Sequence, residues 1–165
     1  MYRKILVPVD GSRTASRGLL EAVRLARNVG ASLRIIHVVE EYSVIQGMGM
    51  GGVAFDVNYL IEVLRADGKK VIEKAVALAR KHGVKADAVS VESFTDRSSE
   101  LIIGEAKKWR ANLIVMGTHG RRGVSRLVLG SDAEIVVRTS PVPVLLVRSP
   151  EPKTPAKKRK PALSA

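Results

Sequence analysis

Short apolar runs alternate along this chain with longer segments in which apolar residues recur at helical spacing. The runs predict strands at residues 5–9, 32–39, 85–94, 113–116 and 142–147. The periodic segments predict helices at residues 17–28, 58–82, 96–109 and 131–138, and Gly30 and Gly83 are placed to end the first two. This alternation predicts a single-domain α/β fold, an open five-stranded parallel sheet with helices on both faces.

Two segments lie outside the alternation. Residues 40–57 are rich in glycine and predict a long loop, either a lid or a disordered segment. Gly47-Met-Gly-Met-Gly-Gly fits the letters of a dinucleotide fingerprint, but such a motif must follow its strand directly and open a helix, and this one does neither. The chain is rich in proline and lysine from Pro150 onward, so we expect a folded domain at 1–149 and a basic, disordered tail at 150–165.

A glycine-containing loop follows the predicted strand that ends at Met116. The loop carries Gly117, Gly120 and Gly123, and it closes at Gly130-Ser131, where a helix is predicted to begin. Glycines let a backbone approach a ligand and adopt positive φ, and a helix N-terminus offers unpaired N–H groups and a positive dipole to a phosphate. In parallel sheets ligands bind beyond the carboxyl ends of the strands, where Asp10 is also expected. The alternative is a solvated loop whose glycines only make turns.

Composition narrows the classes of function. The chain has no cysteine, its three histidines are scattered, and no apolar run approaches the length of a membrane span. The N-terminus, Met1-Tyr-Arg-Lys followed by a predicted strand, does not resemble a signal peptide. A cytoplasmic protein without a disulfide framework or a zinc cluster is therefore expected. The net charge of +12 suits phosphorylated ligands or nucleic acid, but an aromatic content of 4% leaves few stacking platforms for single strands and counts against nucleic acid.

Several motifs together resemble the universal stress protein family over residues 2–148. They are Lys4-Ile-Leu-Val-Pro-Val-Asp-Gly-Ser, Ile36-His-Val-Val, Asn112-Leu-Ile-Val-Met-Gly-Thr-His-Gly, Gly130-Ser-Asp-Ala-Glu and Pro141-Val-Pro-Val-Leu-Leu-Val-Arg. The most specific is the spacing Gly-x2-Gly-x9-Gly-Ser from Gly117. The resemblance implies the strand order 3-2-1-4-5 and the branch of the family that binds ATP.

The resemblance also implies a set of ligand contacts. Adenine would contact Pro8, Val9, Asp10 and the backbone of Val38. Ribose and phosphates would lie against Met116, Gly117, His119, Gly120, Gly130, Ser131 and the amides of Asp132 and Ala133, on the loop that also holds Gly123. At the rim, Arg121, Arg122 and Arg126 could neutralise phosphate charge, although the alternative for each is a solvated basic loop.

Some of these residues have structural alternatives. Asp10 could instead cap the helix that follows it, and Ser131 with Glu134 forms a possible capping box. His119 could simply be an exposed loop residue. The carboxylate of Asp132 favours the helix dipole but repels a polyphosphate unless Mg²⁺ bridges the two, so ATP and Mg²⁺ are expected together.

No arrangement of catalytic residues is recognisable, which favours a binding and signalling module and leaves slow ATP turnover open. The alternatives are a nucleotide-free dimeric scaffold and a basic nucleic-acid-associated protein. In the implied order, the strand at Val142–Val147 lies at an open edge, so we expect a homodimer through it. The alternative is that Pro141 and Pro143 blunt this edge.

Overall fold

The structure is a computed structural model that describes residues 2–40, 57–93, 97–120 and 129–149. Its strands are β1 (Lys4–Pro8), β2 (Ser32–Glu40), β3 (Ala86–Ser93), β4 (Leu113–Gly117) and β5 (Val144–Val147). Its helices are α1 (Arg13–Val29), α3 (Val57–Lys81), α4 (Ser98–Trp109) and α5 (Ser131–Thr139). Most of the predicted loop at 40–57 and all of the predicted tail lie outside the described residues.

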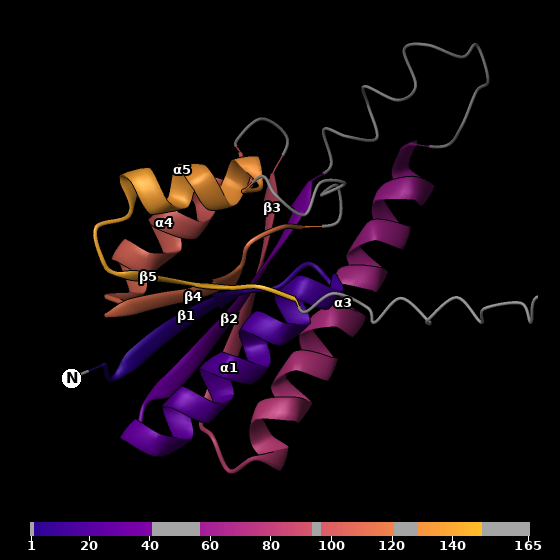
Figure 1. Ribbon diagram of the computed structural model, residues 1–165. Coiled ribbons are helices and arrows are strands. Elements are labelled where there is room, and N and C mark those ends of the chain that lie inside the picture. The colour runs from indigo at the N-terminus through magenta and orange to yellow at the C-terminus, as the bar shows by residue number, and fades with distance from the viewer. Residues whose placement is uncertain (1, 41–56, 94–96, 121–128, 150–165) are drawn as a thin grey trace, which may run out of the picture.

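The strands form one parallel sheet in the order β3-β2-β1-β4-β5, as predicted. The sheet is covered on both faces: α1 and α3 lie on one side and α4 and α5 on the other (Figure 1). The order reverses between β2 and β4 around β1, since β1 pairs with both. This switch point is where parallel sheets leave room for ligands beyond the carboxyl ends of their strands.

Alternation along the strands divides the core into two layers. Ile5 and Val7 of β1 pack with α1 and α3, whereas Leu6 packs with α4 and α5. Successive side chains of a strand point to opposite faces, and both faces here are covered. In the sequence, the strands covered on both faces therefore appear as continuous apolar runs, which explains why they could be recognised. Among the described helices, none combines the length and apolar character needed to cross a membrane.

Several boundaries differ from those predicted. Helix α1 begins at Arg13, a turn before the predicted start, because the Ser12 hydroxyl accepts a hydrogen bond from the Ala15 amide and caps it. It ends as predicted at Gly30, whose left-handed conformation (φ 67°) lets its N–H reach the Ala26 carbonyl. Strand β5 begins at Val144 instead of residue 142, two residues later than predicted.

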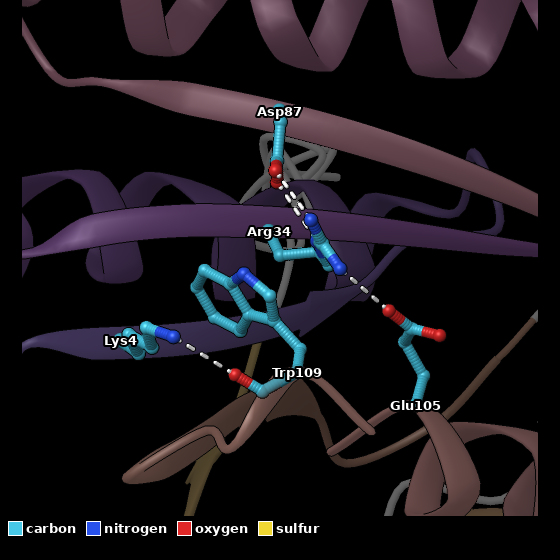
Figure 2. A network of polar contacts seen from close by, with 5 residues as sticks. All are labelled: Lys4, Arg34, Asp87, Glu105 and Trp109. Carbon is cyan, nitrogen blue, oxygen red and sulfur yellow. Dashed lines mark hydrogen bonds and ion pairs between the residues drawn. The ribbon is translucent and has the colours of Figure 1, made fainter. Parts of the chain in front are cut away.

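At the amino ends of the strands, a network of charged side chains ties β2, β3 and α4 together (Figure 2). The guanidinium of Arg34 donates to both carboxylate oxygens of Asp87, at 3.0 and 2.6 Å, and to Glu105 at 2.9 Å. Its carbon Cζ lies 4.9 Å from the ring centroid of Trp109, and Nζ of Lys4 lies 5.4 Å from the same centroid. The bonds to Asp87 raise the pKa of Arg34 above its usual value. Trp109 is thus a packing residue, as its position at the end of α4 suggests.

Candidate functional site

A pocket of about 450 Å³ opens at the carboxyl ends of β1, β2 and β4, within the size range of small-molecule sites. Every predicted contact residue that the structure describes lines it. These are Pro8, Val9, Asp10, Val38, Met116, Gly117, His119, Gly120, Gly130, Ser131, Asp132 and Ala133. Arg121, Arg122, Gly123 and Arg126 lie outside the described residues. Segments far apart in the sequence therefore meet at one place in the fold.

The turn after β1 is arranged around Asp10. Oδ1 of Asp10 accepts a hydrogen bond of 2.9 Å from the Ser12 amide, and Gly11 between them has φ 82°. The suggestion that Asp10 caps α1 is therefore wrong, because Ser12 is the capping residue. Asp10 instead holds the turn and faces the glycine loop, since a Cβ on Gly120 would lie 2.9 Å from its Oδ2.

The described glycines of the loop lie close to other parts of the chain. A Cβ on Gly117 would lie 2.8 Å from the carbonyl carbon of Thr14, so only glycine lets the end of β4 lie this close to α1. The Gly130 amide donates to the Thr118 carbonyl at 2.9 Å, which joins the two ends of the loop. Positive φ among the described glycines occurs elsewhere, at Gly11, Gly30 and Gly83. Close approach to the backbone of α1, rather than an unusual backbone conformation, accounts for glycine at 117, whereas the nearest atom at Gly120 is the end of the Asp10 side chain.

The N-terminus of α5 opens on the pocket. Gly130 is its N-cap residue and makes no side-chain capping bond, so the capping box predicted for Ser131 and Glu134 is wrong. The helix begins one residue too early for it: Ser131 is already helical, and the Glu134 amide donates to the Gly130 carbonyl. The amides of Ser131, Asp132 and Ala133 precede the first intrahelical bond and have no helical acceptor. They form the positive end of α5 beside the pocket.

His119, which also lines the pocket, has an unsatisfied polar atom. Oγ1 of Thr118 and Nδ1 of His119 are 2.9 Å apart, which fixes the ring. Nε2 is buried and has no hydrogen-bond partner within the part of the chain that the structure describes. His119 is half-buried, so the alternative of a simply exposed loop histidine is wrong. A buried polar atom without a partner costs on the order of 1–3 kcal/mol, so a ligand that supplies one is favoured here.

Sequence reasoning missed several residues of the pocket wall. They are Ala15, Ile36, His37, Val39, Leu64, Ser98 and Ile102. One of them had a visible signal: His37 is a polar residue between two apolar pairs, Ile35-Ile36 and Val38-Val39. Leu64 of α3 and Ile102 of α4 had none, because they reach the pocket only through the packing of two helices on opposite faces of the sheet.

Comparison with known proteins agrees with this architecture. Residues 1–148 match the universal stress protein family. The chain belongs to this family. The universal stress protein YxiE of Bacillus subtilis is 32% identical over 152 residues, which cover 90% of this chain and all of YxiE. A solved family member from Burkholderia pseudomallei is 31% identical, with a TM-score of 0.69 over 88% of this chain and 95% of that one.

Two further solved universal stress proteins share the fold and were determined with nucleotides. One, from Archaeoglobus fulgidus, is in complex with dAMP and is 24% identical, with a TM-score of 0.60 over 88% of this chain and 98% of that one. The other is in complex with cAMP and is 22% identical, with a TM-score of 0.60 over 89% of this chain and 97% of that one. At this identity the likeness extends to the fold, and the ligands are those of the two relatives.

Proposed function

We propose that this chain is a cytoplasmic ATP-binding universal stress protein that acts as a stress-response regulatory module. One observation carries the proposal: His119, whose Nε2 has no partner among the described residues, and the first turn of α5, whose amides have no helical acceptor, line the same pocket. A phosphate group supplies the acceptors that both need. The nucleotide complexes of two relatives with this fold support an adenine nucleotide as the ligand.

In the arrangement that we propose, the base and the phosphates occupy opposite ends of the pocket. Adenine lies against Pro8 and the backbone of Val38, beside Asp10, and the phosphates lie at Gly130 and the first-turn amides of α5. When Thr118 donates to Nδ1 of His119, Nε2 carries the proton and donates to a phosphate oxygen. Asp132 also lines the pocket, so Mg²⁺ bound to the phosphates would offset its negative charge.

The polar groups of the pocket suit binding better than turnover. The carboxylate of Asp10 holds the Ser12 amide, the ring of His37 holds the Val9 carbonyl, and the ring of His119 is joined to Thr118. Groups held in place by the protein pre-organise a site, whereas a general base must be poised to take a proton from a water molecule. We therefore propose that occupancy of the pocket, rather than hydrolysis, is the signal.

Calorimetric titration with Mg-ATP tests the site. The wild type should bind saturably, and Gly130→Val should bind at least about tenfold more weakly, because a Cβ there would lie 3.3 Å from the Thr118 carbonyl and the larger side chain would fill the approach to α5. Gly104→Val is the matched control, since a Cβ on Gly104 has no neighbour within 4 Å. Circular dichroism shows whether each variant is folded. Equal affinity of all three folded proteins would refute the site.

We further propose that the protein is a homodimer through β5. This strand pairs with β4 on one side only, and Leu145 on it is 38% exposed. The carbonyls of Pro143 and Val147 accept hydrogen bonds from β4, at the amides of Ile114 and Thr118. Backbone groups alternate in direction along a strand, so the N–H groups of Val144 and Leu146 face the free edge and are available to a second chain.

A further inference from the structure

His37 is a polar side chain inside the core, and its hydrogen bond explains why it is tolerated there. It is 4% exposed on β2, and its Nδ1 lies 2.7 Å from the Val9 carbonyl oxygen. A carbonyl only accepts, so Nδ1 must carry the proton and donate it. Val9 lies one residue beyond the end of β1, and its amide donates to the Ile36 carbonyl at 2.8 Å. Both backbone groups of Val9 are therefore held from β2.

The orientation of Val9 matters because of the residue that follows it. The Val9 carbonyl and the Asp10 amide belong to one planar peptide group, so fixing the first fixes the second. Asp10 then places one carboxylate oxygen on the Ser12 amide and the other opposite Gly120. The position of the His37 ring thus determines how Asp10 is presented to the pocket, which both residues line.

The backbone of helix α3 also limits the position of the His37 ring. A Cβ on Gly68 would lie 2.7 Å from Cδ2 and 2.9 Å from Nε2 of His37, distances that real Cβ atoms do not show. The ring therefore rests directly on the backbone of α3, in the space that a side chain would fill. One turn earlier on α3, Leu64 lines the pocket, as does Val39 of β2, which also lies within 3.4 Å of that Cβ position. Helix α3 therefore forms part of the pocket wall through Leu64 and also contacts the ring of His37 through Gly68.

We infer that His37 is a positioning residue of the nucleotide site and that it couples α3 to the base end of the pocket. A displacement of α3 moves the ring, the ring moves the Val9 carbonyl, and Asp10 moves with it. By the same contacts, a nucleotide that orders Asp10 restrains α3, since coupling between two sites is reciprocal. The inference rests on the proposed ATP site. The simpler alternative is a core histidine that satisfies Val9 and has no influence on the ligand.

A pair of glycine substitutions distinguishes a positioning role of His37 from a purely structural role in the core. Gly68→Ala adds one methyl group that must displace the His37 ring, whereas Gly104→Ala adds the same group in α4 with no neighbour within 4 Å. Calorimetry with Mg-ATP should show about five- to tenfold weaker binding for Gly68→Ala, the equivalent of one hydrogen bond, and an unchanged affinity for Gly104→Ala. Thermal unfolding is measured for both proteins, so that affinities are compared between folded states. Equal affinities of the two variants would overturn the inference.

Substitutions of His37 distinguish positioning from packing. His37→Asn keeps an N–H donor at the place of Nδ1 and should retain most of the affinity, while His37→Leu keeps bulk without the donor and should lose about as much as Gly68→Ala. In a His37→Ala background, Gly68→Ala should have no further effect on affinity, because no ring remains to be displaced. Additive losses would overturn the inference. If the wild type itself binds no ATP, the proposed function fails first, and that result is distinct from a normal wild type with insensitive variants.

Discussion

Replacing Arg34 by methionine should destabilise the fold without affecting the pocket, and the size of the loss can be worked out from its contacts. The pair with Asp87, whose side chain is 53% exposed, is worth about 0.2–1 kcal/mol. The stacking on Trp109, at 4.9 Å, is worth about 0.5–1 kcal/mol. The largest contribution is Glu105, which is 7% exposed and would lose its partner at 2.9 Å, at a cost of about 1–3 kcal/mol. The total is about 2–5 kcal/mol.

Thermal unfolding followed by circular dichroism measures this loss. A protein of this size should lose about 2–4 °C in Tm for each kcal/mol. Arg24→Met is the matched control, because Arg24 is 66% exposed and its ion pair with Glu21 is 3.4 Å long, so its loss should be within about 0.5 kcal/mol. Adding Glu105→Leu to Arg34→Met should recover part of the stability, since the stranded carboxylate is gone. Equal Tm values for Arg34→Met and Arg24→Met would refute the reasoning.

Two further predictions follow from the pocket and from the sheet edge. Asp132→Ala should strengthen ATP binding more at low Mg²⁺ than in excess Mg²⁺, because Asp132 lines the pocket beside the amides of α5 and a bridging cation screens its charge. Calorimetry at two Mg²⁺ concentrations measures the two affinities. An equal effect at both concentrations would mean that the carboxylate lies away from the phosphates. Val144→Pro and Leu146→Pro should convert a dimer to a monomer in light scattering, because each removes an N–H from the free edge of β5, and a monomeric wild type at tens of micromolar would rule out this interface.

The sequence predicted the elements better than it predicted their ends. Continuous apolar runs such as the one at Ile5 are characteristic of strands covered on both faces, and the pattern located every strand of the sheet. Helix starts were harder, since they depend on which of several polar residues makes the capping bond. Asp10 and Ser12 are both capable of capping α1, and only the geometry of the Gly11 turn decides for Ser12. The order of the strands came from the family resemblance, because periodicity carries no information about which strands are neighbours.

The candidate site was predictable where sequence motifs place its residues at the carboxyl ends of strands, as with Gly117 at the end of β4 and Asp10 just beyond β1. It was not predictable where the wall comes from helix packing, as with Leu64, because contacts between α3 and the end of β2 depend on how the helix lies on the sheet. His37 lies between these cases. Its polarity in an apolar run was visible, but its role required the distance to Val9 and the contact with Gly68.

Binding of ATP in this pocket, with its phosphates at His119, can be tested directly by NMR. The chain has three histidines, so the ¹⁵N signals of their rings can be followed individually by NMR while Mg-ATP is added. Mg-ATP should cause a saturable shift at Nε2 of His119 and a smaller one at His37, because both residues line the pocket. His82, just after the end of α3, should not respond and serves as the internal control. Saturable ATP binding that leaves the signals of the His119 ring unchanged would rule out the proposed position of the phosphates.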